Sequence, residues 1–260
     1  MVAYAYDNNA VRVAKSLQEE VTKDTEKIEM GWLIARAQYS RGYSQLEWGL
    51  YGTSDEQGRF QPDQAHIRAA IADFEEAGKY ASPSLKGSIL QELGRAQGFR
   101  RRSEIDTTLA QKTAEAAGNW VGIVGAQDDP YVQILRNGRP GGLTTGAHHL
   151  GKAITFNAVG RPDMAKQALD DLEKLTAGRI PRDQTRNNAW ADIVWAQTAL
   201  GMKDFDIATM KATNALLVCQ DINSVMNIAI IQNIYAQLRQ TPYKEKQDVR
   251  NLGKLLAVQE

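Results

Sequence analysis

The sequence predicts an all-α protein, and three observations support this prediction. Apolar residues recur every three or four positions through most of the 260 residues, which is the period of an amphipathic helix. Very little of the chain alternates apolar and polar residues with the period of two that a half-buried strand requires. The seven prolines all lie near expected turns, as in a helical chain with few strands.

Five helices are expected in the N-terminal half, over residues 9–23, 25–41, 63–78, 83–98 and 103–117. Asp63 is a good cap for the third of these helices. Ser103 and Asp106 resemble a capping box at the start of the fifth. Residues 50–62 are rich in Gly, Ser, Asp and Gln, so we expect a loop there.

The helical pattern is weakest between Gly118 and Gly146, which contains seven glycines and two prolines. We therefore expect N-terminal helical repeats over 1–118, a Gly-rich connector over 119–146 and C-terminal repeats over 147–260. Further helices are expected over 145–159, 162–175, 187–200, 204–219, 223–239 and 245–258. This makes about a dozen helices, which we expect to form one continuous array.

The clearest unit is the pair of expected helices between Asn187 and Cys219. Trp190 and Ile193 begin an apolar stripe along the first helix. Gly201 is expected to end that helix in the left-handed conformation, and Asp204 to cap the second helix. Such a hairpin cannot bury its apolar stripe alone, so it must stack on similar units.

Small residues recur in the second helices of successive hairpins. They stand seven positions apart, which is two helical turns, and so mark the face where one helix lies close to its partner. The matching segments begin at Ala70, Ala110, Ala165 and Ala208, which are 40, 55 and 43 residues apart. The chain therefore contains an irregular repeat.

The clearest hairpin, with Trp190, Gly201, Asp204-Phe205, Ala208 and Ala215, resembles the tetratricopeptide repeat. That family repeats every 34 residues, so the longer spacings here indicate degenerate repeats with enlarged loops. The resemblance implies a helical-hairpin solenoid whose first helices line a concave binding surface.

The chain from Thr144 onward resembles the C-terminal helical-repeat region of bacterial regulators that carry an N-terminal helix-turn-helix. The segments LGKAITFNAVGRPDMAKQALDDLEKL and YKEKQDVRNLGKLL carry this resemblance. It implies a region that dimerises, or that senses a peptide, small ligand or protein. The first expected helix already belongs to the repeat pattern, so we expect no direct nucleic-acid binding by this chain.

Polar residues on the first helices are the candidate binding residues. Amide side chains can pair with the backbone of an extended peptide, and an exposed indole can pack against one of its side chains. By the family's register, the expected groove residues are Glu92, Arg95, Asn157, Asn188, Asp192, Trp195, Gln232 and Asn233. The alternative is that these are ordinary solvated residues and that Trp195 belongs to the core between repeats.

Composition narrows the function classes. The 31 basic residues balance the 31 acidic ones, whereas nucleic-acid-binding proteins usually have a basic excess. The single cysteine, Cys219, excludes an intramolecular disulfide and a thiolate-rich metal site. The start MVAYAYDNN lacks the features of a signal peptide, and no run of 18 apolar residues occurs. We expect a cytoplasmic protein with no membrane contact.

No residue pattern predicts catalysis, a metal or a cofactor. His148 and His149 are adjacent, so on a helix they point about 100 degrees apart. The glycines after Gly138 lack the Lys-Ser/Thr ending of a phosphate-binding loop. Arg100 to Arg102 could contact phosphate or an acidic partner, but a short basic run at a helix end more often complements the helix dipole.

The sequence therefore predicts a non-enzymatic helical-repeat interaction or sensor module of a bacterial regulatory protein. Its expected partners are a peptide, a small ligand or a protein bound in the concave groove, and a second copy of the chain. The alternative is a constitutive scaffold or adaptor subunit, whose apolar helix over 223–239 would be covered by another subunit.

Overall fold

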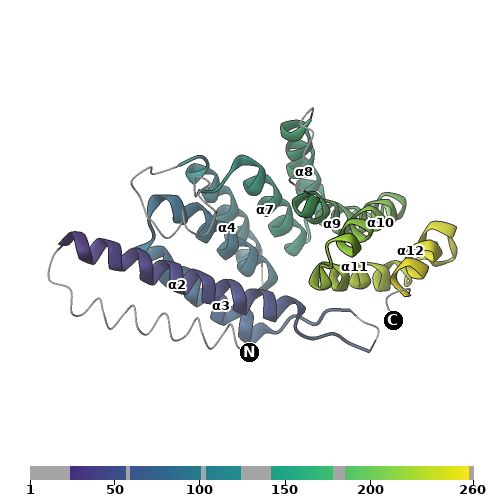
Figure 1. Cartoon of the computed structure of the whole chain (residues 1–260), viewed down its shortest axis with the longest axis horizontal. Coiled ribbons are helices and arrows are strands. Elements are labelled where there is room, and N and C mark those ends of the chain that lie inside the picture. Colours follow the sequence, from purple (N-terminus) through teal and green to yellow (C-terminus); the bar gives the residue numbers. More distant parts are fainter. Residues whose placement is uncertain (1–23, 57–58, 101–103, 124–141, 178–184, 258–260) are drawn as a thin grey trace.

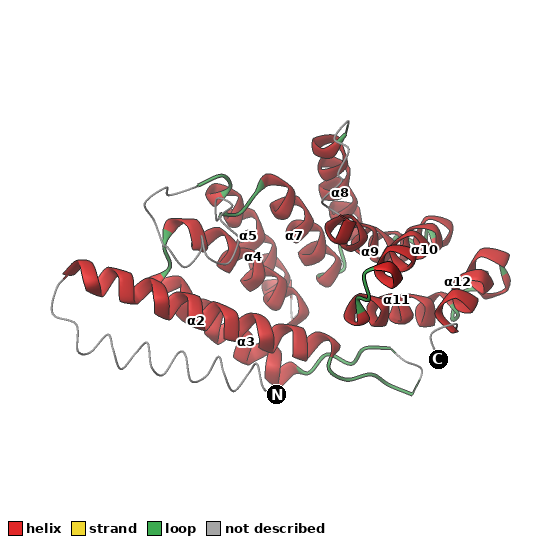
Figure 2. Cartoon of the chain, in the orientation of Figure 1, coloured by secondary structure: helices red, strands yellow, loops and turns green. Residues whose placement is uncertain are grey.

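The computed structural model describes residues 24–56, 59–100, 104–123, 142–177 and 185–257. Within these ranges the chain forms ten α-helices and two short 3-10 helices, and it contains no β-strand (Figure 2). The all-α prediction is confirmed. The expected dozen helices is slightly too many for the described part, because the helix predicted over 9–23 lies outside it.

The helices follow one another with short connections in most places. Their bounds are α2 Asp24–Tyr51, α3 Gln64–Tyr80, α4 Pro83–Arg100, α5 Glu104–Ala116, α7 Thr145–Ala158, α8 Pro162–Thr176, α9 Thr185–Gly201, α10 Phe205–Asp221, α11 Val225–Leu238 and α12 Gln247–Ala257. The 3-10 helices are η1 Ala117–Trp120 and η2 Pro242–Glu245.

Neighbouring helices pack in pairs, and the pairs lie in a row. The most extensive contacts join α2 to α3, α4 to α5, α7 to α8 and α9 to α10. Between pairs, α4 contacts α7, α7 contacts α9, and α9 contacts α11. The row runs from α2 on the left of Figure 1 to α12 on the right. Helix α4 packs on α7 across the predicted Gly-rich connector, so the two halves are in direct contact.

Helix α2 is longer than the sequence analysis predicted. It was expected to end at Arg41, but it continues to Tyr51. The cause is close packing on α3 at two glycines. A Cβ atom at Gly42 would lie 2.9 Å from the Phe74 ring, and one at Gly49 would lie 3.2 Å from Ile67. These glycines bring two helices together and do not mark a loop.

The pair formed by α9 and α10 confirms one predicted helix end and corrects another. Asp204 caps α10, because its Oδ1 accepts a hydrogen bond from the Ile207 amide at 3.2 Å. The left-handed residue between the helices is Lys203, with φ of 63°, and not Gly201. Gly201 instead lies against α8, where a Cβ atom would come 3.1 Å from Pro162 Cβ.

Three apolar clusters form the core. The first joins α2, α3 and α4 around Leu46, Ile67 and Phe74. The second lies between α5, α7, α8 and α9 and contains Phe156. The third joins α9 to α12 and includes Ile231. Helix α9 contributes to two clusters, so it is covered on more than one side.

The loop after α2 links the N-terminal helices to the C-terminal core. Figure 1 shows that the connection between α2 and α3 extends to the region of α11. Tyr51 and Phe60 pack edge to face with ring centroids 5.1 Å apart, and both rest on the C-terminal apolar cluster. Arg59 Nη1 also donates a long hydrogen bond of 3.4 Å to Gln240 Oε1.

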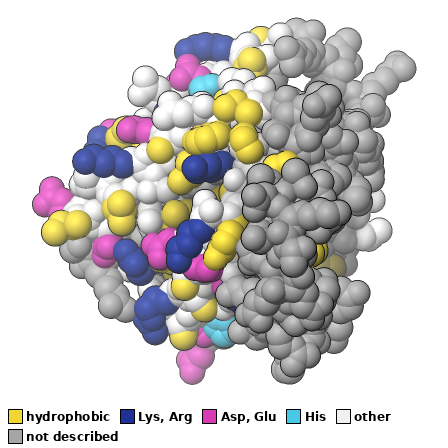
Figure 3. Space-filling model, turned by 90° about the vertical axis from the view of Figure 1, so that its left-hand side faces the viewer, with side chains coloured by type: hydrophobic (Ala, Val, Ile, Leu, Met, Phe, Trp, Pro, Cys, Tyr) yellow, Lys and Arg dark blue, Asp and Glu magenta, His cyan; other side chains and the backbone are white. Residues whose placement is uncertain are grey.

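Figure 3 shows one face of the molecule, on whose described part basic, acidic and apolar side chains are interspersed. Within the described ranges, none of the helices is both long enough and apolar enough to span a bilayer.

Candidate functional site

Arg95 of α4 is the centre of a buried group of charged and aromatic side chains. The residue is 4 % exposed. Its Nη1 lies 2.7 Å from Glu47 Oε1 of α2 and 3.3 Å from Glu92 Oε2 of α4. Its Nη2 donates a hydrogen bond of 3.2 Å to the Tyr51 hydroxyl. We call Tyr43, Glu47, Tyr51, Glu92 and Arg95 the Arg95 cluster.

Helical geometry explains why these side chains meet. Tyr43, Glu47 and Tyr51 are four residues apart on α2, so they share one face of that helix. Glu92 and Arg95 are three residues apart on α4 and lie side by side. The packing of α2 and α4 brings the two faces together, and Tyr43 remains partly exposed at the edge.

The cluster holds two carboxylates against one guanidinium. Burial raises the pKa of Glu92, and the nearby Glu47 raises it further, whereas Arg95 opposes the shift. Burial would lower the pKa of Arg95, but Glu47, Tyr51 and Glu92 outweigh this effect and hold it well above its usual value. Burial also raises the pKa of the Tyr43 phenol. The cluster therefore carries a net negative charge whenever both carboxylates are ionised.

Part of the hydrogen-bonding capacity of the cluster is unused. Both carboxylate oxygens of Glu47 are buried: Oε1 forms an ion pair with Arg95 Nη1 at 2.7 Å, whereas Oε2 accepts no hydrogen bond from the described part of the chain. Arg95 Nε is also buried and has no acceptor there. Such groups are rare in folded proteins because each one loses its hydration without replacement. A polar group of a ligand that reached Glu47 would therefore gain strong, charge-assisted hydrogen bonds.

Asp192 and Trp195 lie elsewhere, on the side of α9 that faces α8 and α10. Asp192 Oδ1 accepts a hydrogen bond of 3.0 Å from Lys211 of α10. The Trp195 indole is 8 % exposed, and the Lys166 and Lys211 ammonium groups lie 5.8 and 5.6 Å from its ring centroid. The prediction of an exposed indole is wrong, because α9 is packed against helices on more than one side.

The remaining predicted groove residues are dispersed. Asn157 of α7 donates a hydrogen bond of 2.9 Å to Thr198 of α9 and so links two helices. Asn188 and Gln232 are exposed. Asn233 accepts a hydrogen bond of 2.8 Å from Gln237 on its own helix. The structure thus joins Glu92 to Arg95, and Asp192 to Trp195 through Lys211, but it does not gather all eight residues at one place.

Sequence analysis missed the contribution of α2 to the cluster. Tyr43, Glu47 and Tyr51 lay beyond the predicted helix end at Arg41 or in the predicted loop. Their spacing of four residues was the available signal, because it aligns side chains only if the segment is helical.

The other polar features stay separate from the cluster. The His148 and His149 rings lie 6.0 Å apart, and burial, with Lys152 and His149, lowers the pKa of His148 to about 4. Within the described ranges, no group of three or more His, Cys, Asp and Glu residues is placed to hold a metal ion. Arg100 pairs with Asp106 at 2.9 Å, while Arg101 and Arg102 lie outside the described residues.

A comparison of the chain with protein-family models, curated proteins and solved structures finds no match. The functional argument therefore depends on the residues and on the packing of the helices.

Proposed function

We propose that the chain is a non-enzymatic helical-repeat module that binds a peptide, small ligand or protein partner. In this proposal α2, α4, α7, α9 and α11 are the first helices of degenerate tetratricopeptide-like hairpins. The contacts of α4 with α7, α7 with α9 and α9 with α11 support this arrangement, because first helices of successive hairpins adjoin in such solenoids. The module would act as the sensor region of a bacterial regulatory protein in the cytoplasm.

The Arg95 cluster is the observation that carries the proposal. It lies on two of the first helices and combines the buried Glu47–Arg95 ion pair, in which Glu47 Oε2 has no hydrogen-bond partner in the described part of the chain, with the partly exposed Tyr43 ring. Two carboxylates face one guanidinium, so the site favours a partner segment that supplies hydrogen-bond donors or positive charge. A tyrosine ring beside the carboxylates suits the same ligand chemistry, since cations are attracted to aromatic faces.

Peptide display tests this function. Random 12-residue peptides would be selected on the immobilised full chain, and the enriched sequence would be synthesised with a fluorescent label. We expect one enriched motif that contains Arg or Lys. Its affinity, measured by fluorescence anisotropy, should fall about tenfold in Glu47→Gln, since one lost charge-assisted hydrogen bond is worth roughly 1.5 kcal/mol or more.

Asp171→Asn is the matched control, because it removes a carboxylate from an exposed ion pair with Lys174 on α8. This variant should bind the peptide like the wild type. Failure to enrich any motif, or equal binding by Glu47→Gln and wild type, would contradict the proposal. Circular dichroism would establish that each variant keeps its helix content.

A second candidate function is a scaffold or adaptor subunit. Exposed large apolar side chains favour it, because seven of the eleven on the described surface fall between residues 202 and 226. Solvent-exposed apolar rows of this kind mark protein interfaces. A scaffold would bind its partner through this outer surface and would be insensitive to Glu47→Gln.

A further inference from the structure

The outer face of α10 is an apolar row that no described part of the chain covers. Ile207 is 38 %, Met210 is 51 % and Leu217 is 48 % exposed. The opposite face of the same helix is buried, with Ala208 and Ala212 in the C-terminal core. Helix α10 is thus apolar on both sides, although only one side packs against other helices in the described ranges.

The exposed row has the spacing of a coiled-coil seam. The exposed positions 207, 210, 214, 217 and 221 are separated by three, four, three and four residues. This alternation keeps side chains in one line along a helix that packs against another helix. The row runs the length of α10, which is about 25 Å for 17 residues.

The row is also self-complementary when read in the opposite direction. With α10 antiparallel to a second α10, Ile207 lies opposite the partner's Leu217, and Met210 lies opposite the partner's Asn214. The same register brings the turn before α10, which contains Lys203, to the end of the partner helix that carries Asp221, so opposite charges face each other at both ends of the seam. It also places Met202 opposite the partner's Ile222, and all of these residues are exposed.

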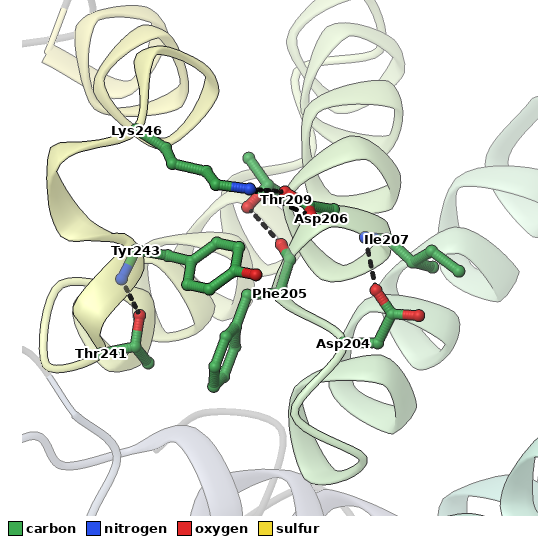
Figure 4. Close-up of polar contacts among 8 residues, drawn as sticks. All are labelled: Asp204, Phe205, Asp206, Ile207, Thr209, Thr241, Tyr243 and Lys246. Atoms are coloured by element: carbon green, nitrogen blue, oxygen red, sulfur yellow. Dashed lines mark hydrogen bonds and ion pairs between the residues drawn. The ribbon is translucent and has the colours of Figure 1, made fainter.

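The surroundings of the row match the anatomy of an interface, with an apolar centre and a polar rim. On one side Asp206 pairs with Lys246 at 2.7 Å, and on the other Lys211 pairs with Asp192 at 3.0 Å. Figure 4 shows the Ile207 side chain pointing away from Lys246 and Tyr243. At the ends, exposed side chains of the adjoining turns and of α11 widen the apolar surface: Met202, Ile222, Val225 and Met226.

We propose that the chain forms a two-fold symmetric homodimer in which α10 packs antiparallel to the α10 of a second copy. A two-fold axis requires a surface that complements itself, and the register around residue 212 provides one. Asn214 is a polar position within the apolar part of the seam, and in this register it faces the partner's Met210. This proposal stands independently of ligand binding at the Arg95 cluster.

The first experiment measures molar mass by light scattering and sedimentation across a concentration series of the full chain. We expect a dimer for the wild type and a monomer for Met210→Glu combined with Leu217→Glu, with a loss of affinity of at least a hundredfold. Both residues are exposed, so the fold should persist. Ile105→Glu is the control, because Ile105 is exposed on α5, and this variant should remain a dimer.

Charge exchange then tests the register. Lys203→Glu and Asp221→Lys should each weaken the dimer several-fold, because each places like charges opposite one another. The double variant should restore the dimer. Within one chain Lys203 lies in the turn before α10 and Asp221 at the other end of this 17-residue helix, which is about 25 Å long, so they are too far apart for their own charges to explain the rescue.

Cysteine cross-linking tests the direction of the helices, in a background where Cys219 is replaced by Ala. Ile207→Cys with Leu217→Cys should oxidise to a covalent dimer, whereas Ile207→Cys alone should not. In the single variant the two cysteines would be about 15 Å apart along the seam, and a disulfide requires Cα atoms within about 7 Å.

Three results would overturn the proposal. They are a monomer at every concentration, a dimer that survives glutamate at positions 210 and 217, and cross-linking by the single cysteine in preference to the pair. None of these results bears on peptide binding at Glu47, so the two proposals fail separately.

Discussion

The two ends of the molecule both have apolar cores, but they differ in the polar contacts between their helices. Charged and polar groups attach α2 to its neighbours: Arg41 and Gln45 both bind Asp73 of α3, and Glu47 pairs with Arg95 of α4. Apolar side chains attach α10 to α9 and α11, with small residues such as Ala208 at the closest approach.

The polar contacts mainly fix how the helices are oriented, whereas the apolar contacts mainly stabilise the fold. Desolvation of a buried ion pair cancels much of its attraction, so such a pair fixes geometry more than it stabilises the fold. Burial of apolar side chains stabilises at about 25 cal/mol for each Å² removed from water. The polar contacts of α2 are therefore sensitive to charge and pH, whereas the apolar contacts at both ends depend on shape.

The largest effect is expected from Arg95→Met. It leaves Glu47 and Glu92 buried beside each other with no cation, and loss of one member of a buried ion pair costs about 4 kcal/mol. Urea denaturation would measure the loss in the free energy of unfolding. Replacing all three side chains by Met should recover most of it, because the triple variant converts this contact to apolar chemistry. A triple variant as unstable as Arg95→Met would show that the comparison between the two ends is mistaken.

Ile231→Ala should have the next largest effect, about 3 kcal/mol, because Ile231 is fully buried among α9 to α12 and its truncation leaves a cavity. The loss should be the same at pH 5 and pH 8, since no charge is involved. Urea denaturation at both pH values checks this expectation. A loss in the free energy of unfolding that varied with pH would show that charged groups also contribute to the contacts among α9 to α12.

Glu92→Gln should remove the pH dependence that the buried Glu92 side chain gives to the free energy of unfolding. Burial raises the folded-state pKa of Glu92 above its ordinary value of 4.5, with Glu47 adding to the shift. The folded protein therefore binds this proton more tightly than the unfolded chain. The resulting stabilisation is present below about pH 4.5 and is lost as the pH rises through the folded-state pKa.

The free energy of unfolding of Glu92→Gln relative to the wild type should accordingly increase as the pH is raised from 4.5 towards 8. Urea denaturation of both proteins across that range would measure the difference. The same difference at every pH would mean that Glu92 titrates normally in the folded protein.

The smallest effect is expected at the helix ends. Asp204→Ala removes the hydrogen bond from Asp204 to the Ile207 amide and should cost about 1 kcal/mol. Asp63→Ala removes a similar cap on α3, where Asp63 Oδ1 accepts a hydrogen bond from the Ala65 amide at 2.8 Å, and should cost about the same. Thermal unfolding would compare the two variants. Equal shifts would show that the difference between the ends lies in the packed faces and not in the caps.

Local patterns in the sequence were sufficient to predict most of the helices, but they were not sufficient to predict the Arg95 cluster. The period of three to four residues located α3, α4 and α7 to α12 closely, and the caps at Asp63 and Asp204 were identified correctly. The segment after Arg41 was not assigned to the helix, and it contains Gly42 and Gly49, which are loop signals in isolation. Only the nearby Phe74 and Ile67 show that they are contact points between helices.

The binding residues depend on relations that a single sequence does not contain. Glu92 and Arg95 were predicted to line a groove; they lie side by side in the structure, but their partner Glu47 is more than 40 residues earlier. Trp195 was expected by the family's register to be exposed in the groove, with burial in the core between repeats as the alternative. The number of helices that surround α9 decided its burial, and this is a property of the whole fold.

The contact of the loop after α2 with the C-terminal core has a consequence for how the molecule unfolds. Helices held only by their neighbours can open one pair at a time from either end. Here Phe60 and Arg59 engage the region of α11, and Arg59 is 181 positions from Gln240. This contact couples α2 and α3 to the C-terminal helices, so unfolding of the C-terminal helices should destabilise α2 and α3. The chain is thereby expected to unfold as one cooperative unit, and the contact itself should form late in folding because of its long sequence separation.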